Sequence, residues 1–254
     1  MLRPRIIPCL LVHNEGLVKT VQFANPKYVG DPINAVRIFN EKEVDELMVV
    51  DIDASARARE PDYALIEHLA AECRMPLCYG GGVKTSEQVE RIVALGVEKV
   101  ALSSGAIEQP QVITAAARSV GSQSIVVVLD VRRRGSSHEV YTHNGQRATG
   151  KSPVELATLL EGSGAGEVVL NSIDNDGMMK GYDLELVSAV RSAINLPITC
   201  LGGAGSLRDI QQLIDAHGAI GAAAGSLFVF KGPYRAVLIN YPNRAARDAI
   251  FVQR

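Results

Sequence analysis

Short apolar runs rich in β-branched residues recur along the whole chain and predict strands that are buried on both faces. Polar stretches with helical periodicity separate most of these runs. One such stretch begins at Ser86 and ends before Gly96, and another follows Pro153. The eight expected strands are residues 6–12, 46–52, 75–79, 97–102, 124–131, 167–171, 196–201 and 219–224.

Eight strands that alternate with helices predict an α/β fold, a closed (β/α)8 TIM barrel. The alternative is an open doubly wound sheet. It is less favoured because no GxGxxG motif follows the first strand. We expect residues 1–254 to form one barrel domain, with a divergent tail over 231–254.

An internal repeat sharpens this picture, because a shift of about 120 residues aligns two halves of the chain, roughly 1–120 and 121–230. "DELMVVDID" meets "GEVVLNSID", Gly80-Gly81 meets Gly202-Gly203, and "IIPCLLV" meets "IVVVLDV". The last alignment pairs Leu11 with Asp130. We interpret the halves as two homologous half-barrels; the simpler alternative is that all βα units look alike.

Composition excludes several classes of protein. Of 254 residues, 47% are apolar and 21% are charged, which is typical of a globular protein. A net charge of -2 gives no reason to expect nucleic acid or a membrane surface as partner. No apolar run approaches the ~20 residues that span a bilayer. Scattered cysteines and histidines without ligand spacing predict a reduced, cytoplasmic protein without a metal or other cofactor.

Clustered glycines follow two pairs of predicted strands at corresponding positions of the repeat. "YGGGVKT" and "LSSGAI" follow the third and fourth strands, and "LGGAGS" and "AAGSLF" follow the seventh and eighth. Glycine turns that open helices bring backbone N–H groups to an anion, and TIM barrels often hold phosphate there. We therefore expect two phosphate sites at one barrel mouth. The alternative is that these glycines only make tight turns.

Acidic residues gather at the predicted carboxyl ends of the strands, where such barrels carry their catalytic groups. They are Asp51, Asp53, Asp130, Asp174 and Asp176. Asp130 ends an apolar run, so partial desolvation should raise its pKa toward the range useful for proton transfer. The alternative is a structural acid paired with a base. Lys19 is expected in a loop after the first strand, either folded over an anion or simply solvated.

Charged residues also mark the starts of four predicted strands, at the opposite end of the barrel. They are Arg5, Glu46, Lys99 and Glu167. Two positive and two negative groups at that level would form an ion-pair ring that closes the barrel floor.

Several motifs together resemble the cyclase subunit of imidazole glycerol phosphate synthase: "RIIPCL", "VGDP", "DELMVVDIDAS", "YGGGVKT", "GSQSIVVVLD", "VYTHNG", "GAGEVVLNSIDNDG", "GYDLEL" and "LGGAGS". The likeness covers the chain to about Phe230. It implies a lyase built as two half-barrels, which takes ammonia from a glutaminase subunit at the barrel bottom. That ammonia cleaves and cyclises a substrate with a phosphate at each end, in histidine biosynthesis.

The resemblance assigns roles to individual residues of this sequence. Asp130 would be a catalytic acid/base, and Lys19 would belong to a substrate-covering loop. Phosphate-binding positions would be Gly81, Gly82 and Ser104 for one site, and Asp176, Gly177, Gly202, Gly203, Gly225 and Ser226 for the other. Arg5, Glu46, Lys99 and Glu167 match the charged gate at the ammonia entrance.

The sequence departs from the family pattern where the second catalytic aspartate is expected, because that position is Leu11. The family's Asn-Thr pair at the first phosphate site is Ser103-Ser104, and its "DRDGT" is "DNDGM". This pattern resembles a divergent branch associated with amidation of sugars for bacterial surface polysaccharide. Three alternatives therefore stay open: a paralogue that amidates a nucleotide-linked sugar, a non-catalytic barrel that docks and activates a glutaminase, and a phosphosugar isomerase. Leucine in place of the acid disfavours the last.

Overall fold

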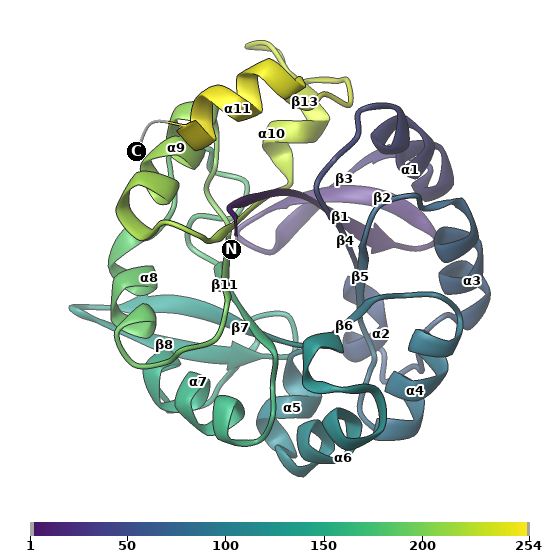
Figure 1. Cartoon of the computed structure of the whole chain (residues 1–254), viewed down its shortest axis with the longest axis vertical. Helices are drawn as coiled ribbons and strands as arrows, with labels where there is room; N and C mark the ends of the chain where they lie inside the picture. The colour runs from purple at the N-terminus through teal and green to yellow at the C-terminus, as the bar shows by residue number, and fades with distance from the viewer. Residues whose placement is uncertain (1–2, 253–254) are drawn as a thin grey trace.

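Eight parallel strands close into a barrel in the computed structural model, which describes residues 3–252 (Figure 1). Strand β12 pairs with β1, and β7 pairs with β10, so the ring has no open edge. All eight predicted strands are confirmed, with shifted ends. In ring order they are β1 (Arg5–His13), β4 (Leu47–Asp51), β5 (Leu77–Gly80), β6 (Lys99–Leu102), β7 (Ile125–Arg134), β10 (Glu167–Ser172), β11 (Ile198–Leu201) and β12 (Gly221–Ala224).

Helices surround the barrel, as Figure 1 shows. Thr85 and Ser206 cap the helices that follow two of the glycine turns, each within a reciprocal capping box. The helical elements are α1 (Pro32–Glu41), α2 (Ile52–Ala56), α3 (Tyr63–Glu72), α4 (Ser86–Ala94), α5 (Ser104–Glu108), α6 (Gln111–Val120), η1 (Ser122–Ser124), α7 (Pro153–Gly162), α8 (Leu184–Arg191), α9 (Leu207–His217), α10 (Ser226–Val229) and α11 (Arg244–Val252).

Each barrel strand contributes to two apolar layers, because successive side chains point to opposite faces. On β1, Ile6 and Leu10 join the large core between strands and helices, whereas Ile7 and Cys9 join a smaller cluster inside the barrel. That inner cluster fills the barrel below its mouth. Its fully buried members are Ile7, Cys9, Met48, Cys78, Ala101, Val126, Val169 and Ala223.

Two antiparallel hairpins extend the barrel at its mouth, and the sequence did not predict them. One continues from β1 as β2 (Gly16–Val21) and β3 (Ala24–Gly30), and the other continues from β7 as β8 (Ser137–Thr142) and β9 (Arg147–Ala148). The expected loop around Lys19 is therefore wrong. This residue lies on β2 with 5% of its surface exposed, because its hairpin folds over the barrel mouth.

The C-terminal tail forms a short hairpin, β13 (Phe230–Lys231) with β14 (Ala236–Val237), and then α11. Two hydrogen bonds hold the end of this tail beside the start of β1. The Tyr241 hydroxyl donates to the Ile6 carbonyl at 2.9 Å, and Arg247 contacts the Asp45 carboxylate at 3.2 Å. Across residues 3–252, no helix has the length and apolar character that a membrane span requires.

Candidate active site

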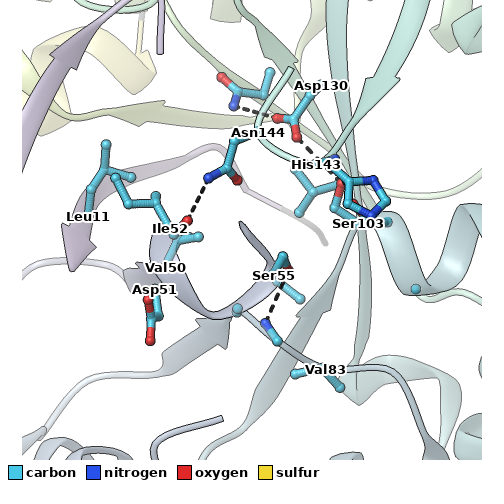
Figure 2. A pocket seen from close by; sticks show the side chains of 18 of the residues that line it. Leu11, Val50, Asp51, Ile52, Ser55, Val83, Ser103, Asp130, His143 and Asn144 are labelled. Atoms are coloured by element: carbon cyan, nitrogen blue, oxygen red, sulfur yellow. Dashed lines mark hydrogen bonds between the residues drawn. The ribbon is translucent and has the colours of Figure 1, made fainter. Parts of the chain in front are cut away.

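A cavity of about 230 Å³ opens at the carboxyl ends of the barrel strands (Figure 2). Figure 2 shows Leu11 and Val50 on one side and Asp130 with Ser103 on the other. This end of a (β/α)8 barrel normally carries the chemistry, because side chains from several strand ends converge there. The cavity therefore has an apolar wall that faces a polar one.

Asp130 is the acid of the polar wall. Its Oδ1 accepts from Asn171 Nδ2 at 2.8 Å, and its Oδ2 accepts from Ser103 Oγ at 3.4 Å. Burial raises the pKa of Asp130 to about 6, although both hydrogen bonds oppose that rise. A carboxyl with a pKa in this range can exchange protons near neutral pH.

The apolar wall occupies the corresponding place in the first half of the chain. Leu11 lies opposite Val50 in the register of β1 and β4, whereas Asp130 lies opposite Asn171 in the register of β7 and β10. Both pairs line the cavity. An acid–amide pair on one side thus faces a purely aliphatic pair on the other.

The first predicted anion site lines this same cavity. Gly81, Gly82 and Ser104 all contribute to its wall. Gly81 has φ +123°, and a Cβ there would lie 2.4 Å from the Asp51 carbonyl oxygen, so the turn requires glycine. Ser104 opens α5, and its Oγ accepts from the His143 backbone N–H at 3.0 Å. A tight turn and a helix start therefore meet at the cavity rim.

The second predicted anion site lies behind the β2–β3 hairpin. Asp176 Oδ2 accepts from Thr20 Oγ1 at 2.7 Å and from the Phe23 N–H at 3.2 Å. Gly177 lies against the Thr20 carbonyl. Thr20 and Phe23 also line the cavity, so the hairpin lies between it and this turn. None of the six residues proposed for this site lines the cavity: Asp176, Gly177, Gly202, Gly203, Gly225 and Ser226.

Lys19 points toward this second set rather than into solvent. Its Nζ donates to the Cys9 carbonyl, and a Cβ on Gly225 would come within 2.6 Å of it. Burial lowers the pKa of Lys19, although Cys9 and Asp176 oppose that fall. The hairpin thus brings a buried amine beside the turn that opens α10.

Three other strand-end acids have structural partners. Asp51 caps α2 by accepting from the N–H groups of Asp53 and Ala54, although it also lines the cavity. Asp53 itself contacts His13 Nδ1 at 2.7 Å. Asp174 accepts from the Arg133 N–H at 2.8 Å. These contacts account for the positions of three of the five acids, and none of the three needs a catalytic role to explain it.

Sequence reasoning missed several cavity residues, of which Asn171 contacts Asp130. A polar residue at the end of the run "EVVLN" was the available signal. Asn144, which follows β8, reaches across the cavity and donates to the Ile52 carbonyl at 2.5 Å. No sequence pattern indicated that contact, because it depends on the hairpin. Within residues 3–252, no three or more His, Cys, Asp or Glu side chains are grouped to hold a metal ion.

The charged residues at the strand starts form one connected ring at the barrel floor. Arg5 contacts both Glu46 and Glu167, the latter at 2.6 Å, and Lys99 contacts the same two carboxylates at 2.9 and 2.8 Å. Burial alone would raise the pKa of Glu167, but Arg5 and Lys99 hold it below its usual value. All four predicted floor residues are therefore brought together.

A small cavity of about 10 Å³ lies directly inside this ring, with Glu46 and Glu167 in its wall. Met48 lines both this chamber and the large cavity above it. Met48, in the inner cluster, thus lies between the ring at the floor and the site that holds Asp130.

We expect inorganic phosphate to bind at the Gly82 and Ser104 turn. Ser104→Asp should weaken that binding at least about tenfold, because juxtaposed like charges cost several kcal/mol. Chemical shifts of the backbone amides during a phosphate titration measure this. Ser152→Asp, which adds the same charge at the exposed N-cap of α7, is the matched control. Equal affinity of wild type and Ser104→Asp would contradict the site.

Comparison with known proteins places this geometry in a family. The model of the family described as "Histidine biosynthesis protein" matches residues 5–234, nearly the whole barrel. A Vibrio vulnificus protein provisionally named an imidazole glycerol phosphate synthase subunit is 58% identical over 245 residues, which cover 96% of this chain and 94% of that protein.

Two further relatives also span most of the chain. A Leptospira interrogans protein with the same provisional name is 56% identical over 253 residues, 99% of this chain and 100% of its own. The imidazole glycerol phosphate synthase subunit HisF of Hyphomonas neptunium is 40% identical over 230 residues, 91% of each chain. With the barrel, the matched family model and these identities together, the chain belongs to the histidine biosynthesis protein family, among the relatives of imidazole glycerol phosphate synthase subunit HisF.

Proposed function

We propose that this chain is the ammonia-using cyclase subunit of a glutamine amidotransferase of the imidazole glycerol phosphate synthase type. It would act as a lyase on a phosphorylated substrate and pair with a separate glutaminase. One observation carries the proposal. Asp130 and a glycine-rich anion turn share a cavity, and Met48 lines both that cavity and a small chamber above the charged floor ring.

Each part of the barrel would then have a task. Gly81, Gly82 and Ser104 would hold one phosphate. The turns after β10, β11 and β12 would hold the other once the β2–β3 hairpin moves away from them. Lys19 would supply positive charge beside that second phosphate. Asp130, with its pKa near neutral, would take up and return a proton during cyclisation.

Ammonia would enter through the floor. The ring of Arg5, Glu46, Lys99 and Glu167 would be the gate, and the glutaminase would dock over it as the second subunit of a heterodimer. A neutral ammonia molecule crosses apolar surface more readily than ammonium, because burying an unpaired charge is costly. The inner cluster around Met48 suits that passage. Four free cysteines fit a reduced compartment, so we place the protein in the cytoplasm.

The test uses the purified chain, an ammonium salt at pH 8 and the bisphosphorylated intermediate of histidine biosynthesis. We expect turnover with ammonia alone, and turnover with glutamine only after the native cell's glutaminase is added. Absence of turnover under both conditions would overturn the cyclase assignment. Failure of any glutaminase to copurify from the native cell would overturn the partner.

A second candidate is a paralogue that amidates a nucleotide-linked sugar for surface polysaccharide. Leu11 favours it, because leucine cannot transfer a proton and lies with Val50 on an apolar wall. A non-catalytic barrel that only activates a glutaminase is less favoured. Asp130 keeps two hydrogen-bond donors and opens to the cavity, an arrangement that a docking role does not need.

Restoring the missing acid separates the first two candidates. If the pocket suits the bisphosphorylated intermediate, Leu11→Asp should raise its turnover, since a positioned carboxylate typically contributes ~10²–10⁴-fold. Val50→Asp, one strand away on the same wall, is the control and should give no gain. Equal turnover of wild type and Leu11→Asp, with activity on a nucleotide sugar instead, would support the paralogue.

A further inference from the structure

Asp130 has an amide partner, Asn171, on the neighbouring strand of the barrel. Asn171 lies opposite Asp130 in the register of two adjacent barrel strands, and it is itself 9% exposed at the cavity wall. We propose that Asn171 is a positioning residue, which fixes Oδ1 of Asp130 so that the proton is taken up and released at Oδ2. This inference deepens the proposed function and rests on it for the catalytic part alone.

The strand register makes the contact a fixed one. β7 and β10 are paired over six consecutive residues, from Val126 with Glu167 to Val131 with Ser172. Neighbouring strands in a closed barrel cannot slide without disrupting this ladder. The backbone therefore holds the two residues opposite each other, and the 2.8 Å bond from Asn171 Nδ2 to Asp130 Oδ1 joins their side chains.

The two oxygens of Asp130 differ in what their partners can do. An amide N–H only donates, so Asn171 can bond Oδ1 whether the acid is charged or neutral, and it leaves no room for a proton there. A hydroxyl both donates and accepts. Ser103 Oγ, at 3.4 Å from Oδ2, can donate to the carboxylate and accept from the carboxylic acid. The proton therefore belongs on Oδ2.

The same bond sets the acidity of Asp130. A hydrogen bond to a charged acceptor is stronger than one to its neutral form, so Asn171 favours the carboxylate. Burial works against it, and so does the charge of Asp176 from the turn after β10. Cys9 faces the acid from β1, and Ser103 faces it from the turn after β6. Among these groups, Asn171 is the main influence that keeps the acid titratable near neutrality.

The apolar wall supports this assignment. In the first half of the chain, Leu11 occupies the position of the acid, and its register partner is Val50 rather than an amide. Acid and amide thus occur together on one side and are both absent from the equivalent positions on the other. If the amide served only the pairing of the strands, it would not be expected to occur only where the acid occurs.

The test compares Asn171→Leu, which has nearly the same size, with Asn171→Ser, whose hydroxyl can still donate. Carbon-13 spectra of aspartate-labelled protein follow the Asp130 carboxyl, identified as the resonance lost in Asp130→Asn. In Asn171→Leu the Asp130 pKa should rise by about one to two pH units. A hydrogen bond to a charged group stabilises that group by an amount of free energy that corresponds to a shift of this size. In Asn171→Ser the rise should be smaller, and Ser103→Ala, which removes the longer bond, should also cause a smaller rise.

The second readout is the pH profile of ammonia-dependent turnover. Its acid limb should move to higher pH in Asn171→Leu, with KM little changed, and Asn171→Ser should partly restore it. An unchanged Asp130 pKa in a folded Asn171→Leu protein would overturn the inference, as would a shifted pKa with an unshifted profile. If Asn171→Leu does not fold, Asn171→Ala, which also lacks a donor, gives the same comparison with Asn171→Ser. A shifted pKa in a protein inactive on every substrate tested would overturn the proposed function and leave the positioning role standing.

Discussion

Asp130→Asn should reduce ammonia-dependent turnover by about 10²–10⁴-fold and make the barrel more stable at pH 8. The rate falls because the amide cannot exchange a proton at the position where the carboxyl does. The stability rises because wild type keeps a charged acid in a desolvated place. Its pKa is about 6 in the fold against an ordinary value of 3.8, a difference worth up to about 3 kcal/mol.

The gain in the free energy of unfolding should depend on pH. A carboxyl whose pKa rises on folding contributes most stability below its unfolded value, and this contribution is lost as the pH rises through the folded value. The gain of Asp130→Asn should therefore be absent near pH 4, appear between pH 4 and 6, and level off above pH 7. Denaturant unfolding at several pH values measures it. Asp215→Asn, on the exposed face of α9, is the control. A gain that does not change with pH would show that the substitution does not stabilise the barrel by removing a charged Asp130.

The barrel itself was predictable because its strands are buried on both faces. Such strands appear in the sequence as short continuous apolar runs, and all eight were found in this way. The two hairpins were not predictable by the same rule. Strand β2 contains Lys19 and Thr20, which are polar and yet buried, because the hairpin folds over the mouth and its partners come from the turn after β10. Long-range packing of this kind leaves no local pattern.

The candidate site residues also differ in whether local sequence predicts them or only the three-dimensional fold does. The strand starts predicted the floor ring, since charged residues on parallel strands at one level must converge in a closed barrel. Asp130 was predicted from its place at the end of an apolar run. Its dependence on Asn171 was not, because the contact follows from the register of β7 with β10, which only the three-dimensional structure supplies. The position of the second anion turn behind a hairpin was hidden for the same reason.

Lys99→Met should lower the free energy of unfolding by about 2–4 kcal/mol at pH 7, because it breaks a largely buried ion-pair ring. The Lys99 ammonium bonds three carboxylate oxygens of Glu46 and Glu167 at 2.8–3.0 Å. Without it, Arg5 would have to balance the charge of two acids that are each 5% exposed. Lys151→Met, which removes the same charge from an exposed site, should stay within about 0.5 kcal/mol of wild type.

Lowering the pH should reveal which charges cause the loss of stability in Lys99→Met. In wild type the pKa of Glu167 is held low, so the ring stabilises the fold above the ordinary pKa of a glutamate and loses this effect only as the pH falls below it. In Lys99→Met the uncompensated carboxylates should instead have raised pKa values. Protonation would relieve their repulsion, and the deficit of the variant should shrink between pH 7 and pH 5. Denaturant unfolding across that range checks this expectation. A deficit that stays constant with pH would mean that lost packing, rather than two unpaired carboxylates, destabilises the floor.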